Sequence, residues 1–100
     1  MTPVTILREA EAEIKEAVEF YEDKRPGLGL DFSREVEASI QSVRHFPKRW
    51  PIRNDGTRRY LLHRFPYIVV YLLLNDHIWI IALAHCKRRP GYWSVRIGSE

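Results

Sequence analysis

The sequence predicts a single α+β domain in which an antiparallel pair of helices packs on one face of a β-sheet. Three observations support this fold class. Helical spacing of apolar residues dominates residues 10–46, strand-like apolar runs dominate residues 58–85, and Pro26-Gly27 separates two helical stretches. Amphipathic helices joined by a tight turn need another layer on which to bury their apolar faces. One hundred residues is a single-domain length, so residues 1–100 are treated as one domain.

The first half of the chain predicts a strand and two helices. Residues 4–7 (VTIL) are short and β-branched, which favours a strand. Residues 10–24 repeat apolar side chains at steps of three and four, which indicates a helix with a solvated acidic face. That face holds Glu11, Glu13, Glu16 and Glu19. A second helix starts near Leu28 and ends before Pro47, along a stripe of Leu28, Phe32, Val36, Ile40 and Val43.

The second half predicts a loop and a β-meander. Residues 48–57 (KRWPIRNDGT) form the loop, and Trp50 is expected to anchor it to the body. Strands are expected at residues 58–64, 67–74 and 77–85. Asn75-Asp76 suits the two-residue turn between the last two strands, because both residue types tolerate positive φ.

A two-residue turn fixes the expected register of that hairpin. Leu74 should lie opposite His77, and Val70 opposite Ile81. Side chains at alternate positions then share a face of the sheet.

This register also divides the two faces of the sheet. Ala82 and Ala84 fall on one face, where their small side chains would let the helical pair approach closely. The other face, with Trp79 and His85, is expected to be open to a partner.

The charge is distributed unevenly along the chain. Residues 1–43 carry five Lys/Arg and ten Asp/Glu, giving −5, and residues 44–100 carry eleven and three, giving +8. A basic half indicates an anionic partner, either nucleic acid or an acidic protein segment. Internal balancing of the acidic helix by the basic sheet explains the pattern equally well.

Several classes of protein are disfavoured. No apolar run approaches the ~20 residues of a membrane helix, and Arg8 and Glu9 interrupt any N-terminal signal region. The single cysteine, Cys86, allows no internal disulfide, so a cytoplasmic location is expected. Four histidines and one cysteine without ligand-like spacing indicate no metal, and no cofactor is expected.

The order of elements and four motifs resemble the ParE/RelE superfamily of type II toxin–antitoxin toxins. The motifs are EAEIKEAVEFYE, RPGLGLDF, RFPYIVVY and IWIIALAHCKRRPGYW, and together they span nearly the whole chain. The resemblance implies an antiparallel sheet with the helical hairpin on one side. It also implies a cognate antitoxin, ParD-like or RelB-like, whose C-terminal segment wraps the toxin as helix and strand in a hetero-oligomer.

The superfamily implies two different activities. ParE-like members inhibit DNA gyrase by binding, and RelE-like members cut messenger RNA on the ribosome with a basic cluster on the central strands. The matching positions here, residues 67–71, read YIVVY and carry no cation. The sequence therefore favours a ParE-like inhibitor. A RelE-like endoribonuclease and an inactive member that serves only as a partner remain as alternatives.

Candidate site residues follow from these activities. A nuclease would use His85, Arg64, Arg88 and Tyr92 for proton transfer and charge. Further cations are Arg58, Arg59 and Arg89. His85 is alternatively a hydrogen-bonded structural histidine.

A protein-binding toxin would use two other surfaces. Arginine, tyrosine and tryptophan are the usual anchors of interfaces, so the target should contact Arg88, Arg89, Tyr92 and Trp93. Alternatively, Tyr92 and Trp93 close the end of the core. The apolar helix faces should receive the antitoxin through Ile14, Val18, Tyr21, Phe32, Val36 and Ile40.

Overall fold

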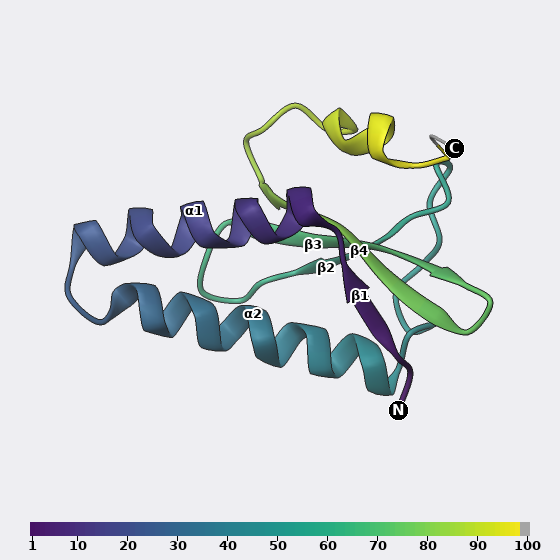
Figure 1. Cartoon of the computed structure of the whole chain (residues 1–100), viewed down its shortest axis with the longest axis horizontal. Helices are drawn as coiled ribbons and strands as arrows, with labels where there is room; N and C mark the ends of the chain where they lie inside the picture. The colour runs from purple at the N-terminus through teal and green to yellow at the C-terminus, as the bar shows by residue number, and fades with distance from the viewer. Residues whose placement is uncertain (99–100) are drawn as a thin grey trace.

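A computed structural model describes residues 1–98 and has two layers, with two antiparallel helices along one face of a four-stranded sheet (Figure 1). The elements are β1 (Val4–Ile6), α1 (Arg8–Lys24), α2 (Leu28–His45), β2 (Arg58–Leu61), β3 (Tyr67–Leu74), β4 (His77–His85) and the 3₁₀ helix η1 (Tyr92–Arg96). The predicted α+β class, both helices and the order of the strands are confirmed. No helix within residues 1–98 is long and apolar enough to cross a membrane.

The sheet is mixed, with strand order β1-β4-β3-β2. Strands β2, β3 and β4 form the predicted antiparallel meander, but β1 pairs with β4 in parallel. The expectation of a wholly antiparallel sheet is therefore wrong at this edge. The helical hairpin brings the chain back beside the N-terminus, where Arg44 Nε donates to the Thr2 carbonyl at 2.9 Å. As a result β2 starts at the end where β1 started, and both strands run in the same direction.

The turn between β3 and β4 has the predicted form. Asn75 and Asp76 both have positive φ, at 52° and 59°, and Leu74 pairs with His77 as expected. Positive φ at both central positions matches the right-handed twist of the two strands.

The register changes farther along this hairpin. Tyr71 pairs with Ile80, but Val70 pairs with Ala82, so Ile81 is an extra residue in β4. The predicted pairing of Val70 with Ile81 is wrong, because Ile81 is itself the extra residue of a β-bulge.

The bulge exchanges the two faces of β4 beyond Ile81. Leu83 lies in the core beneath the helices, whereas Ala82 and Ala84 pack with Trp93 on the opposite face. The expectation that the two alanines face the helical hairpin is therefore wrong. One inserted residue moves every later side chain to the other face.

Hydrophobic cores lie on both faces of the sheet. The first core, beneath the helices, contains an aromatic cluster. The ring centroid of Phe32 lies 5.2 Å from that of Tyr21 and 4.9 Å from that of Phe65. The second core packs Trp93 against the other face. The face expected to be open to a partner is thus partly covered by η1, which lies above the strands in Figure 1, on the side away from α2.

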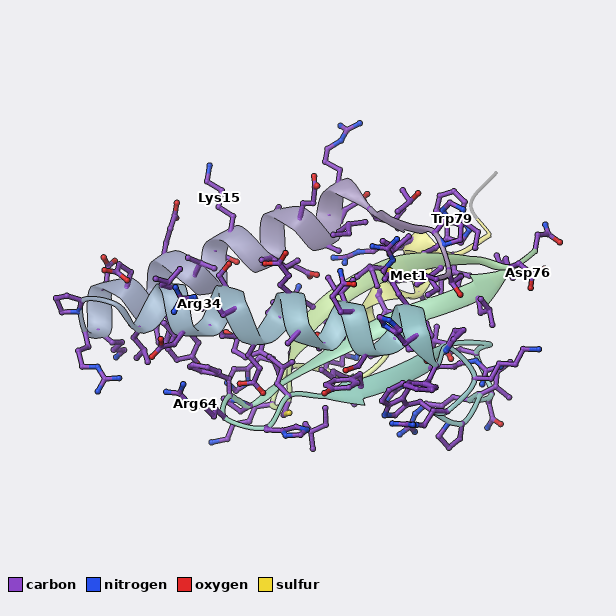
Figure 2. All side chains as sticks on the ribbon, turned by 90° about the horizontal axis from the view of Figure 1, so that it is seen from below. Met1, Lys15, Arg34, Arg64, Asp76 and Trp79 are labelled. Carbon is purple, nitrogen blue, oxygen red and sulfur yellow. The ribbon has the colours of Figure 1, made fainter. Side chains whose placement is uncertain are left out.

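Charged side chains of α1 point into solvent, and the long loop is attached to the sheet. Figure 2 shows Lys15 on α1 pointing away from the body. The ring of Trp50 lies tilted against that of Tyr60 of β2, with 5.0 Å between the ring centroids, and Trp50 packs against the first core. The predicted anchoring of the loop by Trp50 is confirmed.

Candidate functional site

Glu13 of α1 is the centre of a network that attaches the C-terminal segment to the domain. Its carboxylate accepts hydrogen bonds from the Tyr92 hydroxyl at 2.7 Å and the Leu83 backbone N–H at 3.0 Å. The Arg96 guanidinium donates two more, each at 3.0 Å. Only 12% of the Glu13 side chain is exposed. The expectation that Glu13 belongs to a solvated face is wrong, because tertiary structure brings these donors to it.

This network also completes the edge of β4. Strand β1 ends at Ile6, so the edge of β4 beyond Ile80 has no strand partner within residues 1–98. Glu13 accepts from the Leu83 N–H there, and Arg96 donates to the Ile81 carbonyl at 3.0 Å. Buried backbone groups need such partners. The side chains of Glu13 and Arg96 therefore form the hydrogen bonds that a neighbouring strand would otherwise make with this edge of β4.

Tyr92 lies between two arginines. The guanidinium carbon of Arg88 lies 3.7 Å from the Tyr92 ring centroid, and that of Arg96 lies 5.2 Å from it. Arg88 also forms an ion pair with Glu13 at 3.5 Å. Burial and the hydrogen bond to Glu13 raise the pKa of Tyr92. The hydroxyl is thus held protonated, as a donor to Glu13.

An apolar groove of about 330 Å³ lies on the helix side of β1. Ile14, Val36 and Ile40 of the helices line it together with Val4 and Ile6 of the strand. Strand β1 is at the edge of the sheet, and within residues 1–98 its outer side has no strand partner. The groove therefore runs beside a free backbone edge.

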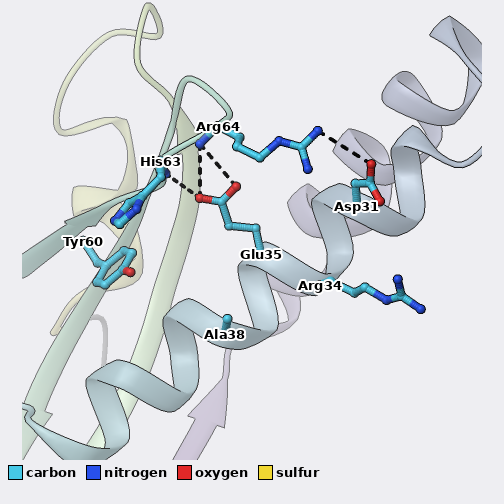
Figure 3. A pocket seen from close by; sticks show the side chains of 7 residues that line it. All are labelled: Asp31, Arg34, Glu35, Ala38, Tyr60, His63 and Arg64. Carbon is cyan, nitrogen blue, oxygen red and sulfur yellow. Dashed lines mark hydrogen bonds and ion pairs between the residues drawn. The ribbon is translucent and has the colours of Figure 1, made fainter.

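A separate pocket of about 580 Å³ lies between α2 and the turn after β2 (Figure 3). Glu35 accepts hydrogen bonds from the backbone N–H groups of His63 and Arg64 in that turn. Arg64 forms an ion pair with Asp31 at 3.6 Å. These polar groups thus pair with one another and fasten the turn to the helix.

Comparison with known proteins gives the family. A family model described as the ParE toxin of the type II toxin–antitoxin system parDE matches residues 4–90. The chain belongs to the ParE toxin family. A solved structure, described as a chromosomal ParDE toxin–antitoxin system from P. aeruginosa, has a TM-score of 0.77 at 16% identity, covering 87% of this chain and 98% of that one. This likeness shows the shared fold. Among curated proteins, none matches the sequence.

The four residues predicted to contact the target of this ParE-family chain differ in exposure. Arg89 is exposed and makes no hydrogen bond or ion pair with residues 1–98. Half of the Arg88 side chain is exposed, at 52%, and Tyr92 is partly buried. Trp93 is only 1% exposed and belongs to the second core. The name C-terminal platform is used below for Arg88, Arg89 and Tyr92.

The residues considered for RNA cleavage do not converge in this ParE fold. Arg64 lies in the pocket beside α2, whereas His85 and Arg88 line another pocket, of about 300 Å³, with Glu13 and Glu16. His85 Nδ1 accepts a hydrogen bond from the Lys87 backbone N–H at 3.0 Å. This contact is the one expected of a structural histidine.

The residues predicted to bind the antitoxin fall into two groups, one in the groove and one in or against the first core. Ile14, Val36 and Ile40 line the groove beside β1. Phe32 is fully buried in the first core, and Val18 and Tyr21 pack against that core.

Glu13 and Arg96 are the important residues that sequence reasoning missed. Glu13 lies three residues after Ala10 and four before Ala17, and both alanines are buried. Residues at these spacings share a helix face, so this signal was present. Nothing local marks Arg96 as the partner of Glu13.

Within residues 1–98, no group of three or more His, Cys, Asp or Glu side chains lies close enough to hold a metal ion.

Proposed function

We propose that this chain is the toxin of a type II toxin–antitoxin pair and that it acts by binding a protein target, DNA gyrase. Membership of the ParE family supports the assignment as the toxin of such a pair. The observation that carries the mode of action is the C-terminal platform, where Arg88 and Tyr92 are fixed by Glu13. A fixed arginine and tyrosine lose little freedom on association, which favours binding.

The geometry gives less support to a RelE-like ribonuclease. The pocket that holds His85 and Arg88 is also lined by Glu13 and Glu16, and carboxylates repel an RNA phosphate. Tyr92 donates a hydrogen bond to Glu13, and burial and this bond raise the pKa of its hydroxyl, so Tyr92 is poorly suited to give a proton to a substrate. An inhibitor that binds its target needs none of these proton transfers.

We infer that a ParD-like antitoxin neutralises the toxin at the groove beside β1, forming a hetero-oligomer in the cytoplasm. The groove is apolar, through Ile14, Val36 and Ile40, and it adjoins the free edge of β1. An amphipathic helix can fill such a groove, and an extended segment can add to such an edge. The similar solved structure is itself described as a ParDE system.

The decisive experiment compares supercoiling with RNA integrity. The purified chain should inhibit plasmid supercoiling by gyrase and leave messenger RNA intact in a translating extract. Expression without the antitoxin should slow growth, and coexpression should restore it. Cleavage of translated RNA with normal supercoiling would establish the ribonuclease instead, and the absence of both effects would establish an inactive member.

Two variants locate the antitoxin site. Ile14→Glu places a charge in the groove and should abolish neutralisation while growth inhibition persists. Lys15→Glu, on the exposed side of the same helix, is the matched control and should leave neutralisation unchanged. Equal neutralisation of both variants would exclude the groove.

A further inference from the structure

Arg59 of β2 is a cation that neither the C-terminal platform nor the groove uses. It pairs with Val70, which places its side chain on the face of the second core. Its guanidinium carbon lies 4.9 Å from the ring centroid of Trp93. Its Nε atom is enclosed and has no hydrogen-bond partner within residues 1–98. An unpaired buried donor costs about 1–3 kcal/mol and is uncommon in native proteins.

A small pocket lies beside this arginine. Its volume is about 70 Å³, and its lining residues include no carboxylate. They are Arg59, Ile68, Ala84, His85, Cys86, Arg88, Pro90 and Trp93. Arg88 is already paired with Glu13, so Arg59 is the lining cation that would attract an anion to this pocket.

The charge of Arg59 is poorly compensated by its surroundings. Burial and the nearby charge of Arg53 lower the pKa of Arg59, and Asp55 opposes this effect. The Asp55 carboxylate already accepts hydrogen bonds from the Thr57 hydroxyl at 2.6 Å and the Trp93 indole N–H at 3.3 Å. Arg59 and Asp55 form no ion pair within 4 Å in the described part of the chain. An external anion would supply the missing partner.

We propose that this pocket binds one carboxylate group, carried on the end of an acidic side chain of a protein partner. Its volume is about that of two water molecules, at ~30 Å³ each, which suits a carboxylate and excludes a nucleotide. The terminal N–H groups of the Arg59 guanidinium form a planar fork that a carboxylate accepts with both oxygens. Only the choice of a protein partner rests on the proposed function.

The small volume, about 70 Å³, favours a side-chain end over a nucleic-acid backbone. Trp93 and Pro90 line the pocket from the C-terminal segment, and Ile68 and Ala84 line it from the sheet. A phosphodiester carries a sugar on each side and needs an open groove. A glutamate side chain enters end-on, with its stem against apolar atoms.

The test is an NMR titration of the whole chain labelled with ¹⁵N. The probe is glutamate blocked at both ends as the N-acetyl amide, and blocked glutamine is the neutral control. Blocked glutamate should shift the Nε–H signal of Arg59 and the indole N–H signal of Trp93 saturably. The Nε–H signal of Arg89 should move little, and blocked glutamine should shift none of these signals.

Two variants connect the shift to the pocket. Arg59→Lys keeps the charge but removes the fork, so binding should weaken at least tenfold, as followed by the Trp93 signal. Cys86→Leu narrows the pocket at an exposed position and leaves Arg59 in place, so it should weaken binding even if Arg59→Lys fails to fold.

Several results would overturn the proposal. These are a non-saturating shift with blocked glutamate, an equal shift with blocked glutamine, or unchanged affinity in the Cys86→Leu chain. Saturation by inorganic phosphate at lower concentration than by blocked glutamate would also overturn it, and would assign the pocket to a phosphoryl group. The titration uses the chain alone, so its result does not depend on whether the chain inhibits gyrase.

Discussion

The carboxylate of Glu13 and the hydroxyl of Tyr92 lie 2.7 Å apart, although 79 positions separate the two residues along the chain. This hydrogen bond joins the first helix to the C-terminal segment. Arg96 and Leu83 donate to the same carboxylate. A single acidic side chain thus holds together the second helix turn of α1, the edge of β4 and η1.

Replacement of Glu13 by glutamine should destabilise the domain strongly. Arg96 is only 13% exposed and would lose its ion-pair partner, and breaking a buried pair costs about 3–5 kcal/mol. We expect a loss near the lower end, because glutamine still accepts one hydrogen bond. Urea unfolding measures this change. Glu11→Gln, at an exposed position of the same helix, should change stability by less than about 0.5 kcal/mol. Similar stability of the two variants would show that the network contributes little.

Reversal of the charge at Arg89 should separate binding from stability. Arg89 makes no ion pair within residues 1–98, so Arg89→Glu should leave the unfolding free energy within about 0.5 kcal/mol of wild type. Target binding should weaken roughly tenfold, which corresponds to about 1.4 kcal/mol. Gyrase supercoiling and growth assays measure this loss.

Arg88→Glu provides the comparison, because it places a second carboxylate near Glu13, to which Arg88 is now paired at 3.5 Å. It should lose binding and also about 1 kcal/mol of stability, a modest value since half of the Arg88 side chain is in solvent. Full growth inhibition by the Arg89→Glu chain would remove Arg89 from the platform.

Tyr71 should make stability fall at alkaline pH. Its hydroxyl donates to the Pro47 carbonyl at 2.8 Å, and burial raises its pKa to about 12, partly opposed by Arg58. The folded chain therefore keeps a proton that the unfolded chain releases above pH 10, the ordinary tyrosine value. This contribution is complete below pH 10 and is lost as the pH rises to about 12.

Urea unfolding of wild type and Tyr71→Phe between pH 8 and pH 12 checks this expectation. The variant should be about 1 kcal/mol less stable at pH 8, because it lacks one hydrogen bond. Its stability should then decline less steeply than that of wild type above pH 10. Parallel curves for wild type and Tyr71→Phe would contradict the assignment.

Gly29 should not tolerate alanine, because α1 lies directly against it. A Cβ atom there would lie 2.7 Å from the Val18 carbonyl oxygen and 2.9 Å from Glu22 Cβ. The backbone of α1 would have to move, and such overpacking costs about 1–3 kcal/mol. Thermal unfolding measures the change. Leu30→Ala, at the exposed neighbouring position, is the control. A stability gain in Gly29→Ala would show that the helices separate easily.

Local pattern was sufficient to predict most elements of the chain. The boundaries of β3, β4 and the turn at Asn75-Asp76 agree with the sequence reading. Apolar spacing identified both helices, since a helix and a strand each need a periodic face to bury. Pro26-Gly27 marked the turn between them, where Gly27 has a φ of 90°. These features depend on residues close together in the chain.

The sequence by itself determined both helices, the strands of the meander, the fold class and the family resemblance, although it placed the end of β2 at residue 64 instead of Leu61 and did not predict η1. The tertiary structure decided the parallel pairing of β1, the bulge at Ile81 and the attachment of η1. The bulge reversed the faces of β4, and η1 then covered the face that local alternation left open. Helical spacing alone placed Glu13 on a solvated face, but donors from β4 and the C-terminal segment make its carboxylate a largely buried hydrogen-bond acceptor. Each of these features depends on contacts between residues far apart in sequence, which local periodicity does not encode.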